Sequence, residues 1–316
     1  MEHDGEDARG CRHHAAVAGV PAMPEHFVSG ALQLLIEIID NVIDLHLAGL
    51  ASRLRVSMAH DHFCVADDGP GIRDEALVAA ATRRMTRRAC DRVHVHLRGV
   101  GLGLSGVNGL AQRLEIEVRR AQEQRRWVFE GGQLRARAEL LGGCEGTGTC
   151  VRVWPEASER GVELPTRRDV EALLERVHWL CPSLRVEFDG RRLADEAGLG
   201  AWIRRQPCWD GSTVHTRGAT WEQQRVELAW SWLRPACRPA QIGFVNLFQI
   251  ATGSHLDGLV DGLAARHGVG RTVAREHGLA LISLLSTTPR VVGSSPRRLD
   301  DPQLRCRIAE MIYSAH

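Results

Sequence analysis

Residues Leu35–Gly49 read LIEIIDNVIDLHLAG and form the most informative run of the chain. Apolar side chains nearly encircle this run, which predicts a mostly buried helix over residues 27–48. Polar residues interrupt the apolar ones at helical spacing and share one face: Gln33, Glu37, Asp40, Asn41 and Asp44. Burying a carboxylate costs free energy unless it is hydrogen-bonded or lies near a cation. This polar stripe therefore either meets a ligand or faces water, and the helix alone does not distinguish the two.

A second motif, Asp67-Asp68-Gly69-Pro70-Gly71, directly follows two predicted strands, Leu54–Met58 and Phe63–Ala66. Its glycines let a ligand approach the backbone closely. Its first aspartate can accept a hydrogen bond from an exocyclic amine. An ordinary Asp-Gly turn accounts for the same residues, so the motif indicates a ligand site only together with other motifs.

A third motif, Gly99-Val100-Gly101-Leu102-Gly103, precedes a predicted helix. Backbone N–H groups at such a helix start can hold phosphate groups. A dinucleotide-binding loop would need a core strand just before the glycines, whereas the preceding segment is rich in arginine and histidine. The run therefore does not fit a dinucleotide-binding loop, and by itself it is only a weak indication of a phosphate site.

Taken in this order, the motifs resemble those of the GHKL ATPases, and among them the B subunits of DNA gyrase and topoisomerase IV. The helix run is similar to their first ATP-site helix, residues 67–72 to their aspartate-glycine turn, and residues 99–104 to the end of their ATP lid. Gly146-Thr147-Gly148-Thr149, with the strand that follows, is similar to their threonine strand. More faintly, Gly253–Leu259 resembles a segment of their transducer domain. The resemblance covers about residues 28–300.

The resemblance implies an α+β fold. A GHKL (Bergerat) α/β sandwich is expected over residues 25–197, followed by a smaller α/β transducer-like domain over residues 198–316. The boundary is placed near residue 197 because the pattern of helices and strands restarts there. Residues 1–24 are expected to form a flexible tail.

The resemblance also implies that the cofactors are ATP and Mg²⁺. Glu37 is expected to be the catalytic general base that activates water. Asn41 is expected to coordinate the magnesium ion that bridges the phosphates. Asp67 is expected to bind the adenine amine, helped by Thr149 through water.

Further nucleotide contacts follow from the same resemblance. Gly71 is expected to leave room for the nucleotide. The glycines Gly99, Gly101 and Gly103 are expected to wrap the phosphates with backbone N–H groups. Arg126 is expected to flank the nucleotide, as an arginine does in the family.

Two features depart from the family pattern. Leu45 and Pro70 replace an acidic residue and an arginine that form an ion pair in the family; losing both charges leaves neither one unpaired. The chain also has no lysine, since all 40 of its Lys and Arg residues are arginine. This excludes a Walker A loop and a protein-kinase lysine.

The missing lysine also affects the expected chemistry. The family's transducer contacts the γ-phosphate through a lysine, and residues 294–296, Ser-Ser-Pro, occupy the aligned positions. Arg290, Arg297 and Arg298 are candidate substitutes, although an arginine is not equivalent to a lysine. The resemblance therefore implies nucleotide binding, and hydrolysis if an arginine supplies this charge.

The composition narrows the classes of protein that remain possible. The net charge of +1 shows no nucleic-acid footprint, so DNA contact stays a hypothesis. No run of 18 apolar residues predicts a transmembrane helix, and the N-terminus lacks the apolar region of a secretory signal. We therefore expect no membrane partner and a cytoplasmic location. The nine cysteines include no C-x-x-C pair, which favours reduced, buried thiols.

We therefore expect an ATP-binding, ATP-hydrolysing protein that resembles the ATPase and transducer part of the B subunit of a type II DNA topoisomerase, without the strand-cleavage machinery. The resemblance implies a homodimer and a separate cleavage subunit as partners. The family's N-terminal arm, which embraces the neighbouring subunit, is not recognisable. The alternative is a degenerate, non-hydrolysing nucleotide-binding module that binds a topoisomerase-like partner or DNA. A histidine kinase is disfavoured because no phosphoacceptor-histidine helix precedes the ATP site.

Overall fold

The structure of the protein is a computed structural model. It describes residues 30–83, 93, 95, 102–135, 138–156, 164–222, 224–235, 237–238, 240–293 and 297–314. The expected tail over residues 1–24 and the glycines Gly99 and Gly101 lie outside these residues. No helix in these ranges has the length and apolarity needed to cross a bilayer.

The first part of the chain forms a nine-stranded sheet. Its strands are β1 (Arg53–Met58), β2 (Phe63–Asp67), β3 (Ala111–Arg120), β4 (Glu123–Glu130), β5 (Gln133–Leu134), β6 (Glu139–Gly143), β7 (Gly148–Pro155), β8 (Arg185–Phe188) and β9 (Arg191–Arg192). They lie in the order β5-β4-β3-β7-β2-β1-β8-β9, and β6 also pairs with β4. The pair β1–β8 is parallel, and the other pairs are antiparallel.

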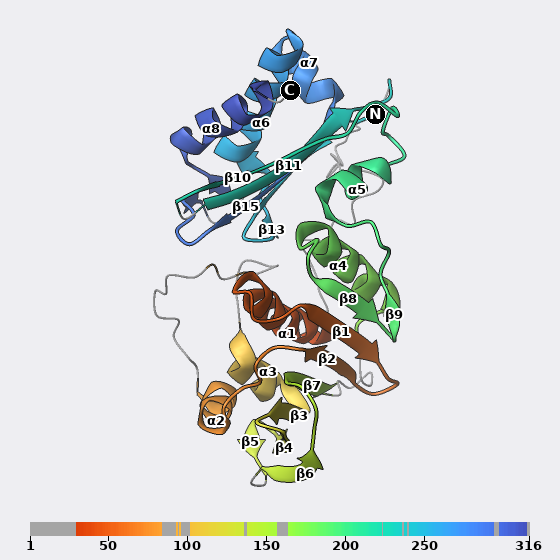
Figure 1. The fold of residues 1–316 in the computed structure, drawn as a ribbon, viewed down its shortest axis with the longest axis vertical. Coiled ribbons are helices and arrows are strands. Elements are labelled where there is room, and N and C mark those ends of the chain that lie inside the picture. The colour runs from red at the N-terminus through yellow and green to blue at the C-terminus, as the bar shows by residue number, and fades with distance from the viewer. Residues whose placement is uncertain are drawn as a thin grey trace, which may run out of the picture.

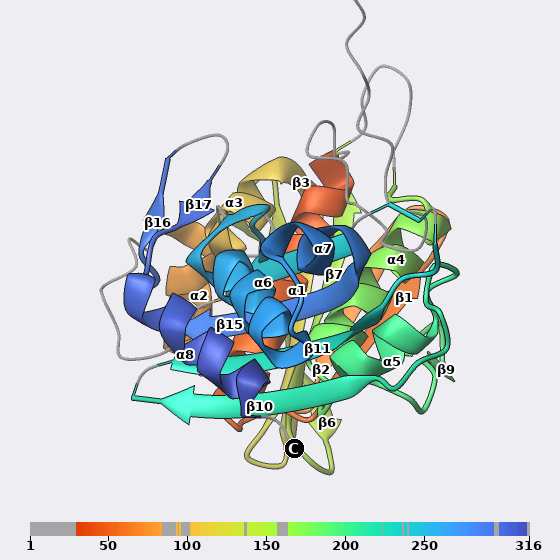
Figure 2. The ribbon, with the colours of Figure 1, turned by 90° about the horizontal axis from the view of Figure 1, so that it is seen from above.

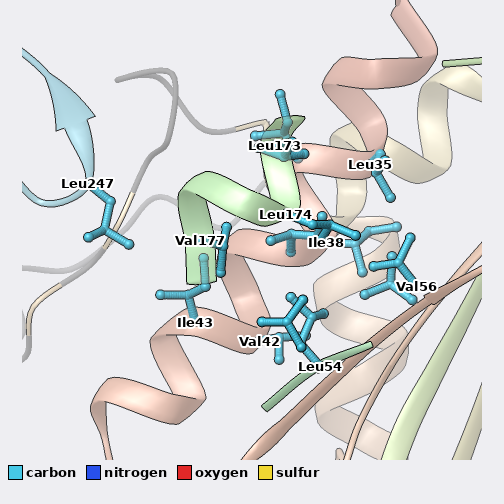
Figure 3. Close-up of a cluster of buried hydrophobic side chains, with 14 of the residues drawn as sticks. Leu35, Ile38, Val42, Ile43, Leu54, Val56, Leu173, Leu174, Val177 and Leu247 are labelled. Atoms are coloured by element: carbon cyan, nitrogen blue, oxygen red, sulfur yellow. The ribbon is translucent and has the colours of Figure 1, made fainter. Parts of the chain in front are cut away.

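Four helices accompany this sheet: α1 (Gly30–Leu47), α2 (Asp74–Thr82), α3 (Gly103–Leu110) and α4 (Arg167–Leu180). Successive strand residues point to opposite faces. On β3, Leu114 and Ile116 are fully buried on one face, whereas Glu117 lies on the other. Figure 3 shows how α1 and α4 contribute to the core, with Ile38 and Leu174 close together. We call the face covered by these helices the inner face, and its opposite the outer face.

The second part of the chain forms a five-stranded sheet in the order β10-β11-β15-β12-β13. The strands are β10 (His215–Trp221), β11 (Gln224–Trp232), β12 (Ala240–Val245), β13 (Phe248–Gln249) and β15 (Gly278–Ser286). A small three-stranded sheet contains β14 (Thr252–Gly253), β16 (Val291–Val292) and β17 (Arg298–Leu299). The helices are α5 (Gly198–Arg204), α6 (Ser254–His267), α7 (Arg271–His277) and α8 (Pro302–Tyr313).

The two sheets belong to separate halves of the molecule, stacked along its long axis in Figure 1 and seen end-on in Figure 2. The first sheet ends at Arg192 and the second begins at His215. The boundary that we place near residue 197 lies between them and remains a proposal, because one continuous apolar core runs from α1 through α4 and α5 to β12 and β15. The observed architecture confirms the expected α+β class, a GHKL-type sandwich followed by a smaller α/β unit.

Two strand predictions are partly wrong. The alternating pattern of Gly243–Phe248 predicts one strand, whereas β12 ends at Val245 and β13 starts at Phe248. Between them Asn246 and Leu247 have φ angles of 47° and 64°, which make a tight turn. The pattern of Ala136–Leu141 also predicts a strand, whereas β6 begins at Glu139 in the part of the chain that is described.

Candidate functional site

The polar stripe of α1 is partly buried. Glu37 is 3% exposed, in the middle of a helix whose apolar residues enter the core. For this residue, the explanation that the stripe simply faces water is therefore excluded. A buried carboxylate needs hydrogen-bond donors around it.

Glu37 finds these donors at the start of another helix. Its Oε2 accepts the backbone N–H groups of Leu102 at 2.8 Å and Gly103 at 3.0 Å, where α3 begins. Its Oε1 accepts the Gln33 side-chain amide at 2.9 Å. The positive end of a helix dipole favours an anion at this point. The stripe of α1 and the end of the glycine-rich run, far apart in the sequence, thus meet directly.

Asn41 lies one turn after Glu37 and is exposed. It lines a cavity of about 830 Å³. Lining residues from the first part of the chain include Asn41, Leu45, Ile72, Gly103 and Ser105. The second part contributes Thr220, Glu222, Gln224, Arg225, Leu285 and Thr287. The cavity is large enough for a small-molecule ligand, and the start of α3 forms part of its wall.

Asp67 ends β2 on the inner face and is 5% exposed. Its Oδ1 accepts the backbone N–H of Gly69 at 2.7 Å and that of Thr149 at 3.3 Å. Burial raises the pKa of Asp67 above its ordinary value, against these hydrogen bonds, which lower it. Thr149 is itself 6% exposed and stands opposite Val118 on the inner face. The structure therefore brings Asp67 and Thr149 together, as the resemblance implies.

The neighbouring Asp68 anchors the turn. It accepts the N–H groups of Ser52 and Arg53, both at 2.8 Å, and the Ser52 hydroxyl at 2.5 Å. Burial alone would raise the pKa of Asp68, but these hydrogen bonds outweigh it and lower the pKa below its ordinary value. Because Asp68 fixes the backbone, Asp67 is held at the end of β2.

The glycines of the turn are required by close packing. Gly71 has a φ of +70°, and a Cβ there would lie 2.8 Å from the carbonyl oxygen of Arg119. A Cβ on Gly69 would lie 2.9 Å from Asp67 Oδ1 and 3.2 Å from the Leu45 side chain. The replacement of the family's acidic residue by Leu45 therefore makes this edge of the turn apolar.

Of the three glycines expected to wrap phosphates, Gly103 is described. It has a φ of +69°, and a Cβ there would meet open space. Gly99 and Gly101 lie outside the described residues, so their expected contacts with phosphate remain a prediction.

Arg126 does not join this group. It stands opposite Glu117 on β3, next to the inner-face pair Ile116 and Trp127. Its guanidinium lies 3.0 Å from the Glu117 carboxylate and 3.9 Å from that of Glu139. Strand alternation thus places Arg126 on the outer face, opposite to Asp67, and the expectation that it flanks the nucleotide stays a prediction.

The residues that the second part contributes to the cavity were missed by sequence reasoning. Thr220, Glu222 and Gln224 lie at the tip of the β10–β11 hairpin, far from α1 in the sequence. No local pattern links them to a site, because only the packing of the two parts brings them to the cavity. Of the expected cationic substitutes, Arg297 lies 4.9 Å from the Phe248 ring centroid.

Comparisons with known proteins agree with this geometry. Residues 28–159 match the family model described as histidine kinase-, DNA gyrase B-, and HSP90-like ATPase. The B subunit of DNA topoisomerase 4 from Francisella tularensis is 32% identical over 255 residues, which cover 73% of this chain and 40% of that protein. Its counterpart in Pseudomonas aeruginosa is 28% identical over 254 residues, covering 72% and 40%. The chain thus spans about 40% of the length of these curated relatives.

Solved structures show the same fold. The 43K ATPase domain of Thermus thermophilus gyrase B, in complex with an aminocoumarin, aligns with a TM-score of 0.73 at 20% identity, covering 94% of this chain and 87% of that one. The topoisomerase IV ATP-binding domain of Francisella tularensis, in complex with a small-molecule inhibitor, aligns with a TM-score of 0.66 at 23% identity, covering 89% and 84%.

Proposed function

We propose that this chain binds ATP with Mg²⁺ and hydrolyses it, because residues 28–159 match the family model described as histidine kinase-, DNA gyrase B-, and HSP90-like ATPase. One observation carries the proposal. The Glu37 carboxylate contacts the backbone N–H groups of Leu102 and Gly103 at the wall of the cavity that Asn41 lines. A candidate general base and backbone N–H groups that can donate to phosphate oxygens thus lie side by side.

Asp67 and Thr149 would hold the adenine end. Both hydrogen bonds described above use Oδ1 of Asp67, which leaves Oδ2 as an acceptor for the adenine amine. The Thr149 hydroxyl would assist through water. Gly71 supports this end indirectly, since its lack of a side chain lets the turn pack against β3.

Asn41 would hold the magnesium ion through its side-chain amide oxygen. Among the described residues no group of three His, Cys, Asp or Glu side chains is placed to hold a metal ion, which fits an ion held mainly by the nucleotide. The ion would supply charge neutralisation between the phosphates.

Glu37 would act when it leaves the start of α3. The freed N–H groups of Leu102 and Gly103 would then donate to phosphate oxygens. The freed carboxylate would accept a proton from the attacking water. Arg290, Arg297 or Arg298 would supply the cation that a lysine provides in the family.

Partners also belong to this proposal. The relatives are named as subunits of DNA topoisomerases, so a homodimer that closes on ATP, a separate cleavage subunit and DNA are the proposed partners. The second part of the chain would transmit nucleotide-driven closure, because its β10–β11 hairpin forms part of the cavity wall.

A second candidate function is a nucleotide-binding module without turnover. The absence of any lysine favours it, because the family's contact with the γ-phosphate cannot form as such. This module would act by binding a topoisomerase-like partner or DNA in a nucleotide-dependent way.

The test compares ATP turnover by the unmodified protein and by Glu37→Gln, with Glu171→Gln on the exposed side of α4 as the matched control. The proposal expects turnover to fall about 10²- to 10⁴-fold in Glu37→Gln and to stay unchanged in the control. Calorimetry with a non-hydrolysable ATP analogue is run in parallel. Magnesium-dependent binding with no turnover in the unmodified protein would favour the module, and neither binding nor turnover would reject both functions.

A further inference from the structure

Two cysteines meet on the outer face of the first sheet. Cys64 lies on β2 and Cys150 on β7, and these strands are antiparallel neighbours. The two Sγ atoms are 2.9 Å apart. Both side chains are half-buried, so the pair differs from the buried, inert thiols that the composition favours.

The pair is open to small molecules. Both cysteines line a groove of about 400 Å³ on the outer face, together with Arg55, Ser57, Glu117 and Gln124. This groove is separate from the cavity beside Asn41, because strand alternation places Cys64 and Cys150 on the face opposite to Asp67. A reagent can therefore reach the thiols without entering the proposed nucleotide site.

The contact between the thiols also favours reaction. The hydrogen bond between Cys64 and Cys150 lowers the pKa of Cys64, and the nearby Arg152 adds to this effect, while burial opposes it. The same contact raises the pKa of Cys150, and burial adds to this effect. The thiolate is the reactive form of cysteine, so Cys64 is the nucleophile of the pair.

We propose that Cys64 and Cys150 are a dithiol modification site, which a low-molecular-weight disulfide such as oxidised glutathione converts to an internal disulfide. The Cys64 thiolate attacks one sulfur of the reagent, forms a mixed disulfide and expels one small thiolate. Cys150 then loses its proton to solvent and attacks Sγ of Cys64, which expels the second small thiolate. Two protein thiols are oxidised and one small disulfide is reduced to two thiols. The Sγ atoms must approach from 2.9 Å to about 2.05 Å, a movement of less than about 1 Å.

The test uses Cys144→Ser as the background, because Cys144 and Cys150 lie on the same tryptic fragment, residues 138–152. The folded protein is incubated with oxidised glutathione, free thiols are alkylated, and the tryptic fragments are identified by mass spectrometry without reduction. The expected product is fragment 56–73 linked to fragment 138–152 through Cys64 and Cys150. Adding Cys64→Ser or Cys150→Ser removes this product, and Cys150→Ser leaves a mixed disulfide with glutathione on Cys64.

The exposed Cys306 reports on the reagent by intact mass in the same sample. The proposal is overturned if Cys306 carries glutathione while Cys64 and Cys150 stay alkylated, or if the two carry separate glutathione groups and the linked fragments are missing. Neither result depends on nucleotide binding, so the proposed dithiol site is tested independently of the proposed ATPase function.

Discussion

The carboxylate of Glu37 accepts the backbone N–H of Gly103 at 3.0 Å, which connects the middle of α1 to the first residue of α3. The same oxygen accepts the N–H of Leu102. One side chain therefore fixes the start of a helix that lies 66 residues further along the chain.

This contact predicts that Glu37→Ala loosens the start of α3. Two N–H groups would lose their acceptor, at a cost of about 1–3 kcal/mol if they stay shielded from water. We expect the amides of Leu102 and Gly103 to exchange hydrogen about tenfold faster or more, measured by exchange with mass spectrometry or NMR. Glu37→Gln keeps an acceptor oxygen and should exchange more slowly than Glu37→Ala. Equal protection in all three proteins would contradict a role of Glu37 as the anchor of this helix.

The raised pKa of Asp67 predicts that nucleotide affinity depends on pH. Burial raises its pKa, so the neutral acid persists to higher pH than in an exposed aspartate. Once protonated, Asp67 presents an O–H donor where the adenine amine needs an acceptor. Affinity for a non-hydrolysable ATP analogue should therefore fall by roughly five- to tenfold as the pH drops through this raised pKa. Calorimetry across pH 8 to 5 measures the fall.

Asp67→Asn serves as the control for that titration, because the amide does not ionise. Its affinity should be weaker at pH 8 and should lose the part of the pH dependence that Asp67 causes. If the unmodified protein and Asp67→Asn show the same pH profile, the ionisation of Asp67 does not contribute to binding.

Gly148 predicts a steric effect on stability at the same site. Its φ is +146°, and a Cβ would lie 2.3 Å from the carbonyl oxygen of Asp67. We expect Gly148→Ala to lower the free energy of unfolding by about 2 kcal/mol or more, measured by urea denaturation. Gly146 is the matched control: its φ is +74°, but a Cβ would meet open space. Gly146→Ala should cost about 1 kcal/mol, and an equal loss in both variants would argue against the clash.

The cysteine pair predicts a link between oxidation and the proposed nucleotide site. Cys150 follows Thr149, and Cys64 lies on the strand that ends at Asp67. A disulfide would shift β2 against β7 and so disturb the 3.3 Å hydrogen bond between Thr149 N and Asp67 Oδ1. We expect the oxidised protein to bind the ATP analogue roughly five- to tenfold more weakly.

Reduction with dithiothreitol should restore the affinity, and Cys64→Ser treated with oxidised glutathione should show no comparable loss. If the oxidised protein binds the ATP analogue with unchanged affinity, the disulfide does not affect the nucleotide site. That result would leave the proposed disulfide itself unaffected.

Local patterns were sufficient for the elements that bury one continuous apolar stripe. The sequence pattern of residues 167–180 predicts a helix, and this helix is α4, Arg167–Leu180, whose start is capped by the Thr166 side chain. Strand β10 was missed because His215–Trp221 is largely polar, with no residue fully buried. Its place in the sheet comes from pairing with β11, a contact that composition does not report.

The sequence alone was enough to establish the order of the motifs, the buried character of α1 and the family of ATPases that the chain resembles. Periodicity and spacing predict the buried helix because they act between residues that are close along the chain, and the family follows from the resemblance of the motifs. The face on which Arg126 lies, the contact between Glu37 and Gly103, and the meeting of Cys64 with Cys150 depend on strand register and on packing between distant segments. A shift of one residue in register would exchange the two faces of a strand, so these relationships appear only when the whole chain is folded.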